Sequence, residues 1–261
     1  MARFIFWTLI LLVFGPATAF AEKRVALVIG NGAYQNVFQL RNATGDAMAI
    51  AALFRKAGFQ IVEGRNDLGQ LEFKRALRDF ERDVQDADIA VVFYAGHGTQ
   101  IWDEDYMLPV DAKIGRGDDV KEEAISLGRI LEALKPAKRR LVILDVGRDR
   151  PFQYTTQHPP VAPVKPSNDA DTLIAYVREY GDTLIAYSTK AGSVAQDGED
   201  DHSPFTMALL KHLGEPGLDI LSALKRVRDD VRTSTGGQQE PFYKGILGGD
   251  NILLVPAPIV P

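Results

Sequence analysis

The chain of 261 residues contains no cysteine. This absence excludes disulfide bonds, so the fold must be held together by its own core. It also excludes a thiol nucleophile at every position of the chain.

A basic stripe is also missing. The chain has 30 Lys and Arg against 35 Asp and Glu, which gives a formal net charge of −5. We therefore expect no nucleic-acid partner, and a mild preference for cationic partners over anionic ones. His158, His202 and His212 stand apart without metal-ligand spacing, so we expect no metal centre built on histidine.

The chain has one long apolar run, and it lies at the N-terminus. Arg3 precedes the run Phe4 to Phe14, Gly15-Pro16 breaks it, and Ala19-Phe20-Ala21 has the spacing of a cleavage site. We predict a signal peptide over residues 1–21 and export of the protein, to the periplasm or out of the cell. The alternative is an uncleaved anchor, which would be the chain's only membrane contact, but the run is short for a bilayer.

Apolar strands alternate with amphipathic helices from residue 22 to residue 255, and a proline-rich tail follows at 256–261. Such repeated units predict an α/β domain with a mostly parallel sheet and helices on both faces. The expected strands are 23–30, 59–63, 88–94, 140–145, 182–187 and 251–255. The expected helices are 43–57, one starting at a capping box in 67–70, one capped by Ser126 and ending at Leu134, one opened by Ser203-Pro204, and 219–233.

Residues 155–181 interrupt this pattern. Residues 155–170 contain four prolines and no apolar periodicity, which predicts an exposed loop. The hexapeptide DTLIAY then occurs at 171–176 and again at 182–187. One reading is a local duplication in a tolerant loop. The other is that the spare copy pairs at a sheet edge, with a partner or a second copy of the chain.

Two predicted strand ends carry polar residues. His97 lies between two glycines just after the strand 88–94, and Asp145 ends the strand in LVILDVGRDRPF, residues 141–152. Open α/β sheets bind ligands at the carboxyl ends of their strands. We therefore expect these two loops to face each other in a functional site.

The segments RVALVIGNGAYQN, LRNATGDA, VVFYAGHGTQ, YMLPVDA, LVILDVGRD and TLIAYSTKAGSVAQDGE resemble, in this order, those of bacterial caspase-like proteins of the metacaspase and orthocaspase type. The resemblance covers roughly residues 23 to 250 and implies a caspase-like three-layer fold. It implies that His97 is the histidine that polarises a cysteine thiol. The family's cysteine lies two residues after the aspartate matched by Asp145, where this chain has Gly147.

The vacated position implies a pseudoprotease. No Ser, Thr or Cys occurs from Leu141 to Gln153, and the backbone N–H groups of Gly98 and Gly147 are what remain to form an oxyanion hole. Whether the chain is an enzyme is left open. One alternative is an endopeptidase that uses another hydroxyl, with Ser188 or Thr189 as candidates. A second alternative is an assembly module with a vestigial cleft.

The resemblance also implies a pocket for Arg or Lys, lined by Asp46 and Asp145, with Ser188 beside it. Two carboxylates suit the fork of donors on a guanidinium, whereas the competing reading is that both cap loop backbones. We expect the chain to bind a peptide or protein partner with basic residues, or to regulate a partner. We expect no cofactor, with calcium at the acidic loop 197–201 as the weaker alternative to a solvated loop.

Overall fold

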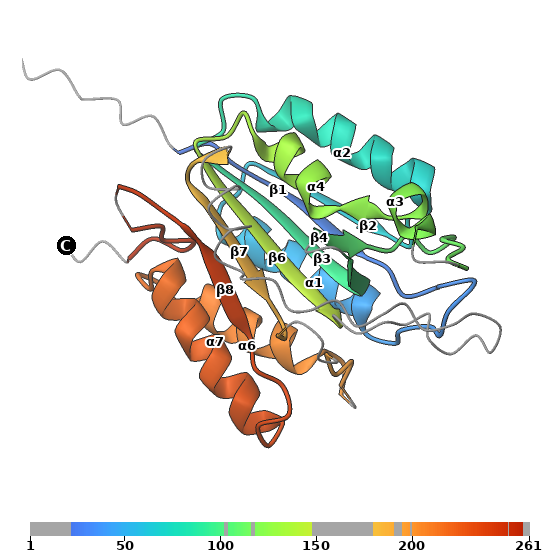
Figure 1. Cartoon of the computed structure of the whole chain (residues 1–261). Helices are drawn as coiled ribbons and strands as arrows, with labels where there is room; N and C mark the ends of the chain where they lie inside the picture. The colour runs from blue at the N-terminus through green and yellow to red at the C-terminus, as the bar shows by residue number, and fades with distance from the viewer. Residues whose placement is uncertain are drawn as a thin grey trace, which may run out of the picture.

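The computed structural model describes residues 22–101, 104–115, 118–147, 180–190, 195–198, 200–249 and 251–257. Within them the chain forms an eight-stranded sheet with helices on both faces (Figure 1). The strands are β1 Arg24–Gly30, β2 Ile61–Asn66, β3 Ile89–Ile101, β4 Glu104–Met107, β5 Ile125–Ser126, β6 Arg139–Gly147, β7 Thr183–Tyr187 and β8 Phe242–Ile246. The helices are α1 Ala43–Lys56, α2 Gln70–Val84, α3 Asp119–Glu123, α4 Leu127–Leu134, α6 Pro204–Leu213 and α7 Ile220–Ser234.

The main sheet runs in the order β2-β1-β3-β6-β7-β8. The pairs from β2 to β7 are parallel, and β8 pairs with β7 in the antiparallel sense. The prediction of a mostly parallel α/β sheet is therefore confirmed.

The sheet is covered on both faces, which explains its continuous apolar strands. Ala26 and Val28 of β1 pack in a core with α1, α6 and α7, while Val25 and Leu27 pack in a second core with α2 and α4. Figure 1 shows these two groups of helices on opposite sides of the sheet. Successive strand residues point to opposite faces, so a strand buried on both sides must be apolar at every position.

Close packing of α1 on β1 fixes the loop between them. A Cβ added to Gly30 would collide with the Ala43 carbonyl and lie 2.7 Å from the Ala47 Cβ atom. The absence of a side chain at Gly30 therefore lets the start of α1 rest directly on the end of β1.

The prediction of a loop just after the strand 88–94 is wrong, because β3 continues to Ile101. Ala95 to His97 pair with Asp145 to Gly147 of β6 in the parallel sense. Gly98 to Ile101 pair with β4 in the antiparallel sense. Both neighbours offer backbone partners along this stretch, so the chain stays extended where its glycines favour a turn.

Two local predictions are also wrong. The expected capping box does not form, since Gly69 occupies the N-cap of α2 and Asp67 accepts hydrogen bonds from the N–H groups of Gly32 and Ala33, both at 2.8 Å. The expected strand 251–255 is absent from the sheet, because β8 takes the edge. That segment instead buries Ile252 and Leu254 against the core beside α7.

Ser126 and Ser203 do cap α4 and α6 as predicted, accepting hydrogen bonds from the N–H groups of Arg129 and Thr206. The second DTLIAY copy forms β7. The expected signal peptide 1–21, the loop 155–170 and the first DTLIAY copy at 171–176 lie outside the described residues. Among the helices that the structure describes, none combines the length and apolar character needed to cross a membrane.

Candidate functional site

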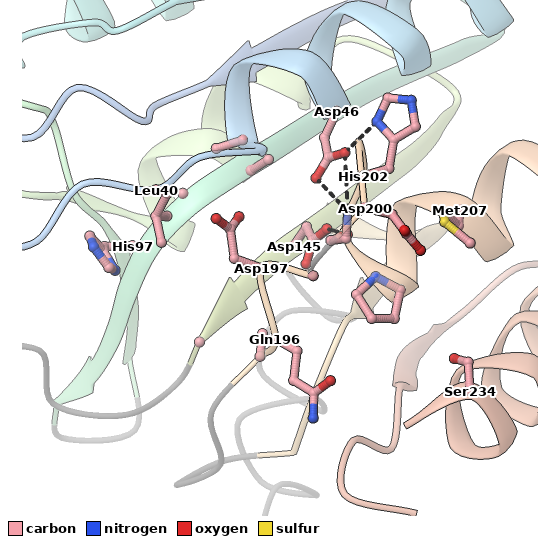
Figure 2. A pocket seen from close by; sticks show the side chains of 18 of the residues that line it. Leu40, Asp46, His97, Asp145, Gln196, Asp197, Asp200, His202, Met207 and Ser234 are labelled. Atoms are coloured by element: carbon pink, nitrogen blue, oxygen red, sulfur yellow. Dashed lines mark hydrogen bonds and ion pairs between the residues drawn. The ribbon is translucent and has the colours of Figure 1, made fainter. Parts of the chain in front are cut away.

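A cavity of about 740 Å³ opens at the carboxyl ends of β3 and β6. Its walls come from the loop between β1 and α1, the two strand ends, the loop before α6 and the first turns of α6. Four residues predicted from the sequence line it together: Asp46, His97, Asp145 and Gly147. Figure 2 shows His97 at one end of the cavity and Asp46 and Asp145 toward the other. We call these the histidine end and the acidic end.

At the histidine end, the imidazole of His97 is held by the loop after β1. Its Nε2 atom lies 2.8 Å from the carbonyl oxygen of Phe38, and the Phe38 ring packs edge-on against it with centroids 4.3 Å apart. A carbonyl only accepts hydrogen bonds, so Nε2 is the donor, and Nδ1 is the basic nitrogen of the neutral ring. The side chain is 4% exposed.

A pair of buried tyrosines, Tyr34 and Tyr94, holds the backbone of His97. The N–H of His97 donates to the Tyr34 hydroxyl at 2.7 Å, and the two tyrosine hydroxyls of Tyr34 and Tyr94 lie 3.0 Å apart. The Tyr94 hydroxyl also lies 3.0 Å from the carbonyl oxygen of His97 and 2.8 Å from that of Leu108, two acceptors for its one proton. Burial raises the pKa of both tyrosines, so both remain neutral hydroxyls. This network could not be predicted from the sequence, because two tyrosines sixty residues apart carry no spacing signal.

Gly96 is required for that network. A Cβ added there would lie 2.5 Å from the hydroxyl oxygen of Tyr94 and 2.6 Å from that of Tyr34. The glycine before His97 thus makes room for the tyrosine pair, not for the turn that its sequence context suggests.

Gly147 lies beside His97 on the neighbouring strand. The two residues are register partners in the parallel pair of β3 and β6, and both line the cavity. A side chain at position 147 would start from the strand adjacent to that of the imidazole.

At the acidic end, two carboxylates are buried and bridged by one residue. Asp46 is 1% and Asp145 6% exposed. The Ser203 N–H lies 3.3 Å from both oxygens of Asp46, and its hydroxyl donates to Asp145 Oδ2 at 2.5 Å. Thr206 donates a second hydroxyl to the same oxygen of Asp145 at 3.1 Å.

This environment makes both carboxyls hard to ionise. Burial first, and then the neighbouring Asp145, raise the pKa of Asp46 to about 8. Burial raises the pKa of Asp145 to about 6, although the hydroxyl donors Ser203 and Thr206 favour its charged form. A bound cation would reverse both effects, because an opposite charge nearby favours the ionised carboxylate.

His202 is a site residue that the sequence analysis missed. Its Nδ1 atom lies 2.8 Å from Asp46 Oδ1, and it lines the cavity (Figure 2). A histidine without metal-ligand spacing gave no signal. Its position next to Ser203, the predicted cap of α6, was the available clue.

The acidic loop 197–201 is tied to the start of α1. Asp197 accepts a hydrogen bond from the Arg41 N–H at 2.7 Å, and the Asn42 side chain donates to the carbonyls of Asp197 and Asp200 at 2.6 and 2.9 Å. The side-chain amide of Asn42 therefore supplies the hydrogen-bond donors for these two loop carbonyls. Among the described residues, no group of three or more His, Asp or Glu side chains is arranged to hold a metal ion.

Gly98 and Ser188 are not among the described residues that line the cavity. Gly98 pairs with Met107 of β4 in the antiparallel ladder. The Ser188 hydroxyl is completely buried and exchanges hydrogen bonds with the backbone of Val146, at 3.1 Å from its N–H and 3.2 Å to its carbonyl. The Thr189 hydroxyl is also buried, at 1% exposure. This placement does not favour either hydroxyl as a nucleophile.

Residues 23–248 match the family model of the caspase domain. Mucosa-associated lymphoid tissue lymphoma translocation protein 1 of Homo sapiens is 32% identical over 92 residues, which is 35% of this chain and 11% of that protein. Caspase b of Danio rerio is 32% identical over 111 residues, which is 41% of this chain and 26% of that protein. The matches thus cover only 11% to 26% of the length of these relatives. Because the family match extends over nearly all of the chain after residue 22, the chain belongs to the caspase-domain family.

Proposed function

We propose that this chain is an exported, catalytically inactive member of the caspase-domain family that binds peptide segments containing Arg or Lys. The observation that carries the proposal is the content of one cavity. It holds two buried carboxylates, whereas the strand position beside His97 is a glycine in a chain without cysteine.

Peptide cleavage by this family's chemistry requires a nucleophile next to the histidine. Loss of the nucleophile in a comparable hydrolase costs about a million-fold in turnover, or roughly 8 kcal/mol. His97 is still held with Nδ1 as its basic atom, but the residue beside it on β6 has no side chain to deprotonate.

The acidic end supplies what a basic side chain needs. Two carboxylates bridged by Ser203 offer acceptors to the planar fork of a guanidinium, and burial strengthens each charge-assisted hydrogen bond. The raised pKa values point the same way, because they mark carboxyls that gain stabilisation when a cation arrives.

The binding half of the proposal is tested by titrating the protein with two short peptides that differ in one residue. One carries arginine and the other citrulline, which has the same shape without the charge. We expect only the arginine peptide to bind, and Asp145→Asn or Asp46→Asn to weaken it at least about thirtyfold, as for the loss of one partner of a buried charge pair.

Asp79→Asn is the matched control, because Asp79 is a half-exposed acid on α2 that pairs with Arg82. It should leave binding unchanged. Equal binding of the arginine and citrulline peptides, or an equal loss in all three variants, would contradict the proposal.

Export is tested separately by N-terminal sequencing of the protein recovered from cells. We expect the mature chain to begin at Glu22, after Ala19-Phe20-Ala21. A retained Met1 would contradict this part of the proposal and leave the binding part standing.

A further inference from the structure

Large apolar side chains lie exposed around the acidic cavity. Phe38 is 56% and Met207 46% exposed, and both line the cavity together with the half-buried Leu40. Exposed apolar groups that gather at one concave site mark a binding surface, whereas single ones scattered elsewhere need no explanation.

These side chains flank the carboxylates on two sides. Phe38 packs against the His97 ring at the histidine end, and Leu40 lies on the same side of the carboxylates in Figure 2. Met207 lies on α6, on the far side of Asp145 and Asp200 in Figure 2. A ligand whose basic group reaches Asp46 and Asp145 therefore has apolar walls on either side of that group.

The cavity is also larger than a single basic side chain requires. Its volume of about 740 Å³ falls in the range of sites that enclose whole small ligands, about 300 to 1,000 Å³. An arginine side chain that fills the acidic end leaves the apolar walls in contact with whatever is joined to it.

We infer that the site recognises a pair of neighbouring residues, one basic and one bulky and apolar, within a peptide. This inference rests on the proposed function and refines its substrate class. A small hydrophilic cation matches the carboxylates alone, but a peptide with an apolar residue next to Arg or Lys matches both the charge of the acidic end and the apolar walls.

The expected gain in affinity from the apolar residue is modest, because the side chains that form the apolar walls are already about half buried in the free protein. Burying about 40 Å² of apolar surface contributes about 1 kcal/mol at roughly 25 cal/mol per Å², which is about fivefold in affinity.

The test compares three capped peptides, Ala-Arg-Ala, Leu-Arg-Ala and Ala-Arg-Leu, by calorimetric titration of the full mature chain. We expect at least one leucine peptide to bind about fivefold more tightly than Ala-Arg-Ala. Met207→Ser or Phe38→Ser should remove this difference, and Met207→Ser should leave binding of Ala-Arg-Ala within about twofold. Thermal unfolding of each variant checks that it folds.

Met48→Ser is the matched control, since Met48 is 61% exposed on α1 and is not among the described residues that line the cavity. It should preserve the preference for leucine. Equal binding of all three peptides, or a preference that survives both Met207→Ser and Phe38→Ser, would overturn this inference alone. Failure of every peptide to bind would overturn the proposed function and this inference with it.

Discussion

The histidine end and the acidic end of the cavity differ in what they contain. At the histidine end, the imidazole and its backbone are held by Phe38 and the tyrosine pair, but the adjacent strand position is Gly147. At the acidic end, two carboxylates are buried and supported by hydroxyl and amide donors. Under the proposed function, binding and cleavage would depend on separate groups, so one could operate without the other.

The largest effect that sharpens this comparison is the pH dependence of binding at the acidic end. The pKa of Asp46 is about 8 in the empty protein, so this carboxyl is mostly protonated at pH 6 and must lose its proton to pair with a cation. We expect the affinity for an arginine peptide to rise by about tenfold per pH unit from pH 6 to pH 8 and then level off. Titrations across this range measure it, and a flat profile would contradict the role of Asp46.

The Asp46 carboxyl also makes the stability of the fold depend on pH, but stability should fall with rising pH whereas peptide affinity should rise. Asp46 has a folded-state pKa above its unfolded value, so its contribution to folding is greatest at low pH and is lost as the pH rises toward about 8. We expect the peptide-free protein to melt at a lower temperature at pH 8 than at pH 6, and saturating arginine peptide to reduce that difference. Melting curves with and without the peptide measure both.

Gly96→Ala should disturb the histidine end of the cavity and leave the acidic end intact. The added methyl group would overlap the hydroxyl oxygens of Tyr34 and Tyr94, and we expect a loss of about 2 to 3 kcal/mol of unfolding free energy from this overpacking. Arginine-peptide binding should persist in the folded fraction.

Gly45→Ala is the control for this change, because Gly45 lies inside α1 and its added methyl group would have open space, with the carbonyl oxygen of Asp201 3.7 Å away. It should be neutral or stabilise the protein by up to about 1 kcal/mol. Equal denaturation midpoints for the two variants would show that the tyrosine pair does not constrain Gly96.

Ser203→Ala damages only the acidic end, with a smaller effect. Ser203 caps α6 and also donates to Asp145, whereas Ser126 caps α4 without contacting either carboxylate of the acidic end. We expect about 1 kcal/mol of destabilisation from the lost cap in each serine-to-alanine variant. Only Ser203→Ala should also weaken arginine-peptide binding, by about fivefold, because Asp145 loses a donor that favours its charged form. An equal loss of binding in both variants would contradict this assignment.

Much of the fold could be predicted from the sequence, because the main parallel strands and the longer helices have clear apolar patterns. The short strands β4 and β5 and the edge strand β8 could not, since their pairing depends on partners that only the folded chain supplies. The error at 251–255 has the same origin. Its apolar residues are buried as expected, but against α7 and the core instead of in the sheet.

At the site, the positions of His97, Gly147, Asp46 and Asp145 followed from strand ends and from the family resemblance, and the structure brings them to one cavity. The groups that support them did not follow from either. The group that holds the His97 ring is the backbone carbonyl of Phe38, and every residue type has such a carbonyl. His202 contacts Asp46 only because the fold brings the start of α6 next to α1.

The central claim is that the cavity binds a basic peptide and does not cut it. The most direct measurement compares hydrolysis of an arginyl peptide by the natural chain, by Gly147→Cys, and by Gly147→Cys combined with His97→Ala. The account predicts no turnover by the natural chain, and cleavage after arginine by Gly147→Cys that the second substitution abolishes. Turnover by the purified natural chain that disappears in His97→Ala would contradict it.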